Sequence, residues 1–290
     1  MSKKVLITGE NSYIGNLLKK KLQHSADDYE IDTISVRGDS WRENNFGQYD
    51  SIVHVAAIVH SKQQVSNLYY EINRDLVGEV AKKAKNEGVE QFLFLSSMAV
   101  YGLAEGAIEG DTIPHPKNDY GKSKLEAENL LIDMESKKFT VSIVRPPMIY
   151  GPGAKGNYTM LRKIALIAPV LPKINNRRSM LFIDNLLTIL EAILSNKIGG
   201  IIYPQNDEYT NTSKMMTTIR KAHGKKTIES KLLGSIVISF KNIPGSIGVK
   251  ITKAFGTLYY SKTISDNVKY SNEKSSLVES IYITEKMNIK

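Results

Sequence analysis

Cysteine is absent from the 290-residue chain, which excludes disulfides, thiol nucleophiles and zinc sites built on cysteine thiolates. The longest apolar run in the second half, residues 232–240, is ended by Lys241 and falls far short of a bilayer span. We expect this run to lie in the core; the weaker alternative is that residues 232–257 associate with a membrane. The first ten residues hold too few apolar side chains for a signal peptide. The sequence therefore predicts a cytoplasmic protein with no integral membrane segment and no metal site.

Positive charge is distributed unevenly along the chain. The net charge is +9, yet residues 1–155 sum to −2 and residues 156–290 to +11. A basic half indicates an anionic partner, such as nucleic acid, an anionic lipid surface or a phosphorylated small substrate. Aromatic residues are not interleaved with the basic ones in a stacking pattern, and no nucleic-acid-binding module is recognisable. We therefore expect no nucleic-acid partner.

Short apolar runs alternate with segments of helical spacing in the first half of the chain. Near-continuous apolar runs are typical of parallel strands that helices cover on both faces. The runs that predict strands are residues 3–8, 31–36, 51–56, 91–97, 141–145 and 200–204. Helical spacing is found at residues 14–22, 74–88 and 180–194. This alternation predicts an α/β fold with a Rossmann-like, doubly wound parallel sheet and right-handed crossovers.

The composition changes after the segment "RPPMIYGPG". Proline, glycine and basic residues become more frequent there, and the strand and helix alternation ends. A chain of this length with 41% hydrophobic residues can bury one core with a lobe grown onto it. We predict a Rossmann domain over residues 1–155 and a smaller C-terminal lobe over residues 156–290. Residues 181–204 are expected to return to the sheet.

The segment "TGENSYIG" follows the first predicted strand and opens the first predicted helix. Turns need glycine for many reasons, but this context is typical of a dinucleotide-binding turn, in which glycines let the backbone approach a pyrophosphate. The residues expected to bind the cofactor here are Gly9, Ser12, Tyr13, Ile14 and Gly15. Ser12 stands where the usual pattern has glycine, and we expect its hydroxyl to donate to the phosphates. Residues 1–155 are therefore predicted to bind NAD(P).

The end of the second predicted strand indicates which nicotinamide cofactor is used. An acidic residue there would bind the ribose 2′-hydroxyl of NAD, whereas an arginine would fit the 2′-phosphate of NADP. The segment reads "TISVRGDS", with Ser35 and Arg37 but no carboxylate at the strand end. NADP is therefore favoured over NAD. In the alternative interpretation, Arg37 is a solvated loop residue and Asp39 binds the ribose.

The segment "NDYGKSKLEAE" places Tyr120 and Lys124 four residues apart, on one face of a helix. A nearby ammonium favours a phenolate, so Lys124 could lower the pKa of the Tyr120 phenol toward neutrality. Ser97, at the end of the fourth strand, could hold the same substrate oxygen. Such a spacing also arises by chance between surface residues. Together with the upstream turn it favours catalysis by Ser97, Tyr120 and Lys124.

The segments "TGENSYIG", "VAAIVH", "SSMAVYG", "DYGKSKLEAE" and "RPPMIYGPG" together resemble the extended short-chain dehydrogenase/reductase family, the NAD-dependent epimerases and dehydratases that modify nucleotide sugars. The likeness covers residues 1–205 strongly. It implies that Tyr120 is the acid and base, and that Lys124 lowers its pKa and binds the nicotinamide ribose. It also implies that Ala56 and Asn73 line the cofactor, and that the protein is a homodimer.

The family resemblance extends to the second half, where it implies substrate-binding residues. The segment "NNRRSMLFIDNL" places Arg178 where the family has an arginine that grips the nucleotide diphosphate. A guanidinium suits phosphate, in agreement with the basic second half, although Arg178 could also be one more solvated charge. Asn157 and Ser97 are the other residues predicted to bind substrate. The lobe over residues 156–290 is therefore predicted to bind a UDP-sugar.

More narrowly, "INNRRSMLFI", "RPPMIYGPGAKGNY" and "ISVRGDSW" resemble bacterial enzymes that complete UDP-N-acetylfucosamine or UDP-N-acetylquinovosamine for surface polysaccharides. These reduce a UDP-4-keto-6-deoxy-N-acetylhexosamine with NADPH. Many 4-epimerases of the family have Asn where this chain has Met148, which favours a reductase. The alternatives are a 4-epimerase acting on UDP-glucose or UDP-GlcNAc with bound NAD, and a dinucleotide-binding sensor without catalysis.

Overall fold

The computed structural model describes residues 2–59, 66–265 and 275–286, and divides the chain into two compact units. The first unit comprises Met1–Gly102, Ile113–Pro146 and Leu187–Pro204, and the second comprises Leu103–Thr112, Pro147–Leu186 and Gln205–Lys290. The prediction that one part binds the cofactor and the other the substrate stays a prediction. In the described ranges, no helix has both the length and the apolar character needed to cross a membrane.

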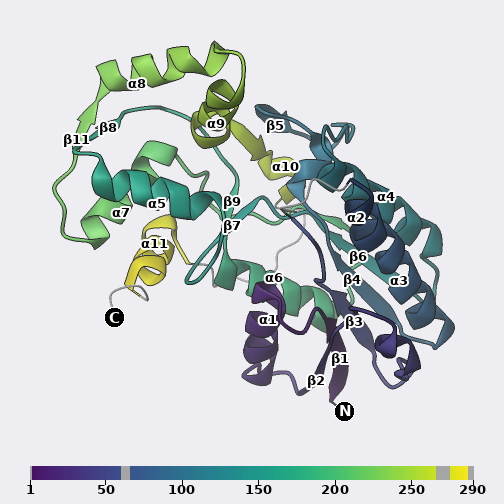
Figure 1. Cartoon of the computed structure of the whole chain (residues 1–290). Helices are drawn as coiled ribbons and strands as arrows, with labels where there is room; N and C mark the ends of the chain where they lie inside the picture. The colour runs from purple at the N-terminus through teal and green to yellow at the C-terminus, as the bar shows by residue number, and fades with distance from the viewer. Residues whose placement is uncertain (1, 60–65, 266–274, 287–290) are drawn as a thin grey trace. The chain divides into compact units, whose positions relative to one another are not determined.

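The first unit is built on a six-stranded parallel sheet with the order β10-β6-β4-β3-β1-β2 (Figure 1). The strands are β1 (Lys3–Thr8), β2 (Tyr29–Ile34), β3 (Ser51–His54), β4 (Gln91–Leu95), β6 (Thr140–Val144) and β10 (Gly200–Ile202). The helices are α1 (Tyr13–Gln23), α2 (Ser66–Tyr70), α3 (Leu76–Asn86), α4 (Asp119–Met134) and α6 (Ile183–Asn196), the last from Leu187 onward. This confirms the predicted α/β, Rossmann-like parallel sheet.

Helices cover both faces of this sheet, as near-continuous apolar strands require. Alternate strand residues such as Ile52, Phe92 and Ile143 pack with Val80 of α3 and Leu131 of α4 in one cluster. On the opposite face, α1 and α6 lie side by side and are joined by an ion pair between Lys21 and Glu191 (Figure 1). The carboxyl ends of the strands consequently meet at one edge, where the predicted site residues follow them.

The second unit contains short elements and three two-stranded parallel sheets, β11-β8, β12-β5 and β7-β9. Its strands are β5 (Gly106–Ile108), β7 (Met148–Tyr150), β8 (Val170–Pro172), β9 (Met180–Phe182), β11 (Ile228–Ser230) and β12 (Leu258–Tyr260). Its helices are α5 (Asn157–Ile167), α7 (Thr212–Ala222), α8 (Lys231–Ser239), α9 (Ser246–Phe255), α10 (Lys262–Ser265) and α11 (Leu277–Lys286).

Three sequence-based expectations need correction. Four strands end two residues earlier than predicted: β2 at Ile34, β3 at His54, β4 at Leu95 and β10 at Ile202. The register of β2 follows β1 from Lys3 to Thr8. Met180–Phe182 is a strand paired with β7, so the helix predicted from residue 180 begins at Ile183. The apolar run expected in the core instead forms most of α8, in which Leu232 is 73% exposed.

Candidate active site

The turn between β1 and α1 has the geometry of an anion-binding turn. Gly9 has a φ of +101°, and a Cβ there would lie 3.1 Å from the backbone nitrogen of Ala56, so a larger residue would be strained. Ser12 caps α1, because its Oγ accepts a 2.9 Å hydrogen bond from the N–H of Gly15. The first turn of α1 carries no acidic residue. The helix start thus suits the pyrophosphate of a dinucleotide, and the Ser12 hydroxyl proton remains available to donate.

The residues after β2 place Arg37 and Asp39 in different surroundings. Arg37 is exposed, and its backbone N–H donates to the Ser35 hydroxyl at 3.3 Å. The Asp39 carboxylate accepts a 3.0 Å hydrogen bond from Arg42, which also pairs with Glu79. Asp39 is therefore already engaged by a guanidinium, whereas Arg37 extends its charge into solvent beside the strand end.

Asn73 supports the loop after β3 from within. Its side chain is fully buried, and it exchanges two 3.0 Å hydrogen bonds with the backbone of Ile58. Its amide nitrogen also lies 3.4 Å from the Ser123 hydroxyl of α4. Asn73 therefore connects α4 to the loop that carries Ala56. The prediction that Asn73 lines the cofactor stays a prediction.

Tyr120 and Ser97 are brought together by the close approach of two backbone segments. A Cβ at Gly121 would lie 2.7 Å from the carbonyl oxygen of Ala99, so glycine lets α4 begin directly against the turn after β4. Asn118 caps α4 by accepting the Gly121 N–H at 2.8 Å. The Ser97 side chain lies close enough to the Tyr120 phenol to influence its pKa. Burial raises the pKa of Tyr120, while the nearby Ser97 hydroxyl acts to lower it.

Lys124 lies on the same helix face but is bonded elsewhere. Its side chain is almost fully buried, and its Nζ donates a 2.9 Å hydrogen bond to the carbonyl oxygen of Leu95 and lies 4.4 Å from the centre of the Phe94 ring. Burial lowers the pKa of Lys124 to about 7, while the charge of Glu128 acts to raise it. The expectation that Lys124 lowers the pKa of Tyr120 therefore needs correction, since the phenol pKa is raised and the ammonium is only partly populated at neutral pH.

A buried ion pair lies under the site and was not foreseen from the sequence. Glu128 and Arg145 are 0% and 4% exposed, and an Arg145 Nη2 to Glu128 Oε2 contact of 2.5 Å joins them. Ser96 also donates to Glu128, and Arg145 donates to the Tyr101 hydroxyl at 2.8 Å. The pair connects α4 with the ends of β4 and β6. Glu128 continues the four-residue spacing of Tyr120 and Lys124, which is the signal that could have revealed it.

The pKa of Lys124 predicts a dependence of stability on pH. Its folded pKa of about 7 lies below its ordinary value of 10.5, so the unfolded chain binds more protons between these pH values. The destabilising effect of Lys124 is therefore complete below about pH 7 and is relieved as the pH rises toward 10.5. In denaturant unfolding, a Lys124→Met variant should be more stable than the native chain near neutral pH. That advantage should shrink as the pH rises; parallel pH profiles would contradict this.

The two predicted substrate residues of the basic half lie in the second unit. Asn157 is the exposed first residue of α5. Arg178 is mostly buried, its Nη1 donates a 2.8 Å hydrogen bond to the carbonyl oxygen of Gly256, and burial lowers its pKa. In the part of the chain that the structure describes, no carboxylate forms an ion pair with Arg178. The charge of Glu105 acts on this partly buried guanidinium without forming an ion pair, and its remaining N–H donors suit an anionic ligand.

Comparisons with known proteins agree on one family. A model described as the NAD dependent epimerase/dehydratase family matches residues 5–203. The chain is 29% identical over 259 residues to the UDP-glucose 4-epimerase of Vibrio cholerae, covering 78% of each protein. It is 26% identical to the N-acetyl-alpha-D-glucosaminyl-diphospho-ditrans,octacis-undecaprenol 4-epimerase of Escherichia coli O157:H7, covering 78% of this chain and 74% of that one. It is also 26% identical to the GDP-6-deoxy-D-mannose reductase of Pseudomonas aeruginosa, covering 70% and 74%.

Solved structures share the fold. The UDP-glucuronic acid 4-epimerase from Bacillus cereus in complex with NAD has a TM-score of 0.74 at 18% identity, covering 98% of each chain. RMD from Pseudomonas aeruginosa, complexed with NADPH, has a TM-score of 0.75 at 19% identity, covering 99% of this chain and 98% of that one. At such identities the likeness concerns the fold alone. One of these neighbours holds NAD and the other NADPH.

Proposed function

Because the chain belongs to the NAD-dependent epimerase/dehydratase family, we propose that it reduces the 4-keto group of a UDP-4-keto-6-deoxy-N-acetylhexosamine with NADPH. The product would be UDP-N-acetylfucosamine or UDP-N-acetylquinovosamine, for the synthesis of a surface polysaccharide. The observation that carries this proposal is the closeness of the Tyr120 phenol and the Ser97 side chain, at the same edge of the sheet as the turn of Gly9 and Ser12.

The residues of the site suit proton donation. When bound, the nicotinamide cofactor would supply a hydride to C4 of the sugar. Because burial raises the pKa of Tyr120, its phenol is protonated near neutral pH and can donate that proton to the C4 oxygen. Ser97 can donate a hydrogen bond to the same oxygen as negative charge develops on it. Lys124 donates a hydrogen bond to the Leu95 carbonyl and so connects the helix that carries Tyr120 with the end of β4.

The second unit offers groups for the nucleotide part of the substrate. We assign the diphosphate to Arg178, because its buried guanidinium keeps hydrogen-bond donors beyond the one that Gly256 accepts. Asn157, exposed at the start of α5, is assigned to the same substrate as a polar contact. Both assignments accord with the basic character of the second half.

Replacing Arg37 tests the cofactor assignment. An Arg37→Ala variant should raise the KM for NADPH roughly 10- to 100-fold, because it removes a charge-assisted bond to the 2′-phosphate. The KM for NADH should change little. Lys20→Ala is the matched control, since Lys20 is an exposed cation in the last turn of α1, at the end opposite the phosphates. An equal loss with both cofactors would assign Arg37 another role.

A UDP-hexose 4-epimerase with bound NAD is the second candidate, and the names of two relatives favour it. An epimerase returns the hydride to its own substrate and so consumes no cofactor. Denaturing freshly purified protein and assaying the released nucleotide separates the two functions. Stoichiometric NAD, with interconversion of UDP-glucose or UDP-GlcNAc, would favour the epimerase.

The reductase is tested by the absorbance of NADPH. Purified protein should oxidise NADPH only when the UDP-4-keto-6-deoxy-N-acetylhexosamine is added, and UDP-GlcNAc should not replace that substrate. If NADPH is not oxidised when this keto sugar is added, the proposal is excluded; C4 is trigonal in the keto sugar, so the same compound serves the gluco and the galacto series.

A further inference from the structure

The second unit exposes an unusual amount of apolar surface on α8, α9 and the segment between them. We call it the α8–α9 surface; its side chains are 41% to 73% exposed. They are Leu232, Ile236, Phe240, Ile243, Ile247 and Val249. Gly234 fixes which side of α8 faces inward, because a Cβ there would lie 2.3 Å from the carbonyl oxygen of Lys173. The outward side therefore remains apolar, and contiguous surface of this kind marks an interaction site.

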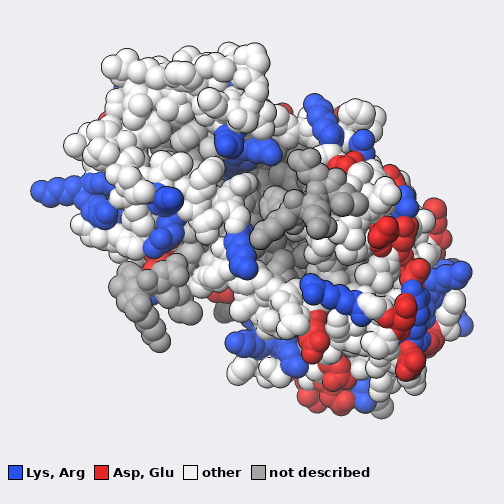
Figure 2. All heavy atoms as spheres, viewed as in Figure 1, with Lys and Arg blue, Asp and Glu red and all other residues white. Residues whose placement is uncertain are grey.

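The charge of this segment has only one sign. Residues 230–256 contain four lysines and no aspartate or glutamate. Lys241 pairs with Glu105 at 2.6 Å, while in the described ranges no ion pair involves Lys231, Lys250 or Lys253. Figure 2 shows mostly uncharged surface over α8 and α9, with basic residues at its margin. An apolar face bordered by lysines is typical of a segment that lies in the interface of an anionic membrane.

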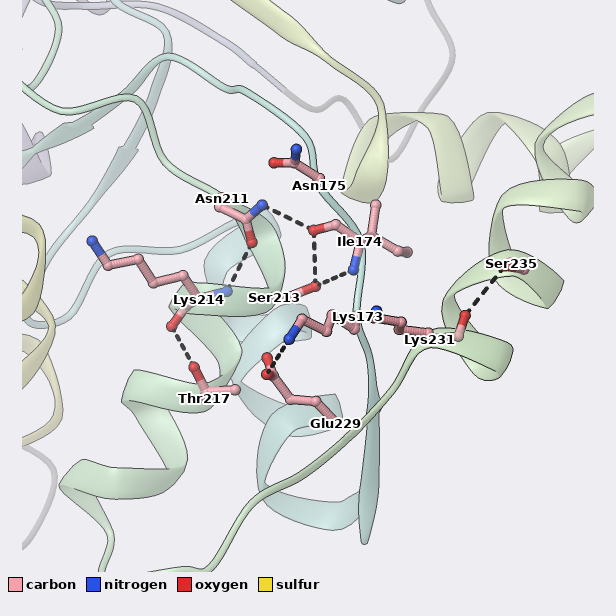
Figure 3. Close-up of a pocket in the computed structure, with 10 residues that line it drawn as sticks. All are labelled: Lys173, Ile174, Asn175, Asn211, Ser213, Lys214, Thr217, Glu229, Lys231 and Ser235. Atoms are coloured by element: carbon pink, nitrogen blue, oxygen red, sulfur yellow. Dashed lines mark hydrogen bonds and ion pairs between the residues drawn. The ribbon is translucent and has the colours of Figure 1, made fainter.

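A basic cavity adjoins the start of α8 (Figure 3). It has a volume of about 720 Å³ and is lined by Lys173, Lys214 and Lys231 together with Glu229. Lys173 faces Glu229 at 3.9 Å and Lys214 pairs with Glu208 at 3.2 Å, so in the described ranges Lys231 is the lining lysine that forms no ion pair. None of the predicted catalytic or cofactor residues lines it. Lys231 thus lines this cavity and also borders the α8–α9 surface.

We propose that the α8–α9 surface docks onto an anionic phospholipid bilayer, with its apolar side chains in the headgroup boundary and its lysines at the lipid phosphates. A second copy of the chain fits less well, because a two-fold contact would place the same lysines opposite one another without an acidic residue between them. An acidic groove on another protein would also match the lysines. The test below distinguishes that partner from a membrane. The proposal does not rest on the reaction assigned above.

Vesicle flotation tests the proposal directly. The full chain should float with vesicles of phosphatidylcholine and phosphatidylglycerol, and much less with phosphatidylcholine alone, and raised salt should weaken the binding. The double variant Ile236→Asp and Ile247→Asp should lose at least tenfold in the bound fraction. Lys250→Glu with Lys253→Glu should lose binding to the anionic vesicles as well. Ile113→Asp is the control, because Ile113 is 83% exposed in the first unit.

Three results would contradict the membrane proposal. Absence of flotation with anionic vesicles would overturn the proposal, and so would equal, salt-insensitive flotation with both vesicle types. If the Ile236 and Ile247 variant changes the oligomeric state in light scattering, the surface is covered by a second copy and the proposal is wrong. Circular dichroism keeps unfolding distinct from lost docking, since these exposed substitutions should leave the spectrum unchanged.

Discussion

Replacing Tyr120 by Phe is expected to lower kcat about 10²- to 10⁴-fold, which is the usual contribution of a positioned acid or base. In the proposed reaction the phenol donates the proton at C4, and Phe keeps the ring whose centre lies 6.5 Å from that of Tyr69. Binding of NADPH, followed by fluorescence, should therefore stay within a few-fold of the native value. The loss should appear in kcat and in kcat/KM alike, because the proton is transferred in the chemical step.

The control for this substitution is Tyr29→Phe. Tyr29 begins β2, and its hydroxyl is hydrogen-bonded to Ser195 at 2.8 Å, so the change also removes one partly buried hydroxyl. It lies at the amino end of the strand, away from the predicted site, and should leave kcat nearly unchanged. A Tyr120→Phe protein that retained native kcat on the keto sugar would remove the phenol from the mechanism.

Removing Glu128 is expected to have the largest effect on stability. Glu128→Ala would leave the Arg145 guanidinium buried without its carboxylate, and breaking such a pair costs about 3–5 kcal/mol. Urea unfolding should show a lower midpoint at an unchanged slope. The double variant Glu128→Leu with Arg145→Met should recover most of the loss, because it removes both charges and keeps the volume.

An exposed pair in the same unit provides the comparison. Lys4 and Glu30 lie 3.1 Å apart, with side chains 45% and 57% exposed. Glu30→Ala should leave the unfolding transition close to that of the native chain, because water and salt screen this pair. If Glu128→Ala is no more harmful than Glu30→Ala, the buried pair does not hold α4 to the strand ends.

The regular part of the first unit could be predicted from sequence because its signals are local. Near-continuous apolar runs and a glycine-containing turn gave the strands and the anion-binding turn, and the structure confirms the sheet. The spacing of Tyr120 and Lys124 placed both residues on one helix face. Ser97 comes close to Tyr120 because α4 begins against the turn that follows β4.

The details that sequence could not supply depend on which partner a side chain finds. Lys124 turns to the Leu95 carbonyl, and burial then sets its pKa, which spacing along a helix cannot reveal. The side-chain amide of Asn73 forms hydrogen bonds with the backbone of Ile58 in the loop after β3. Ser12 caps a helix while standing where glycine is usual. Each of these contacts depends on the three-dimensional fold or on the local backbone geometry, and the type of residue alone does not determine either.

The α8–α9 surface shows that an apolar segment of the sequence need not be buried in the fold. An apolar run of this length predicts burial, but whether it is buried depends on how much partner surface the rest of the unit supplies. The side of α8 near Gly234 packs against the backbone of Lys173, and Leu233, Val237 and Ile238 are partly buried. Leu232, Ile236 and Phe240 stay exposed. A hydrophobic pattern therefore indicates that a segment needs an apolar neighbour, without stating that the same chain provides it.

Product analysis by NMR tests the central claim, that Tyr120 and Ser97 form the site of a C4-keto reduction on a UDP-sugar. The purified protein is incubated with the UDP-4-keto-6-deoxy-N-acetylhexosamine and NADPH, and the Tyr120→Phe protein is treated in parallel. We predict one molecule of UDP-6-deoxy-N-acetylhexosamine, with a single configuration at C4, for each NADPH oxidised, and none with the variant. An unchanged keto sugar, or equal product from the native and variant proteins, would contradict the account.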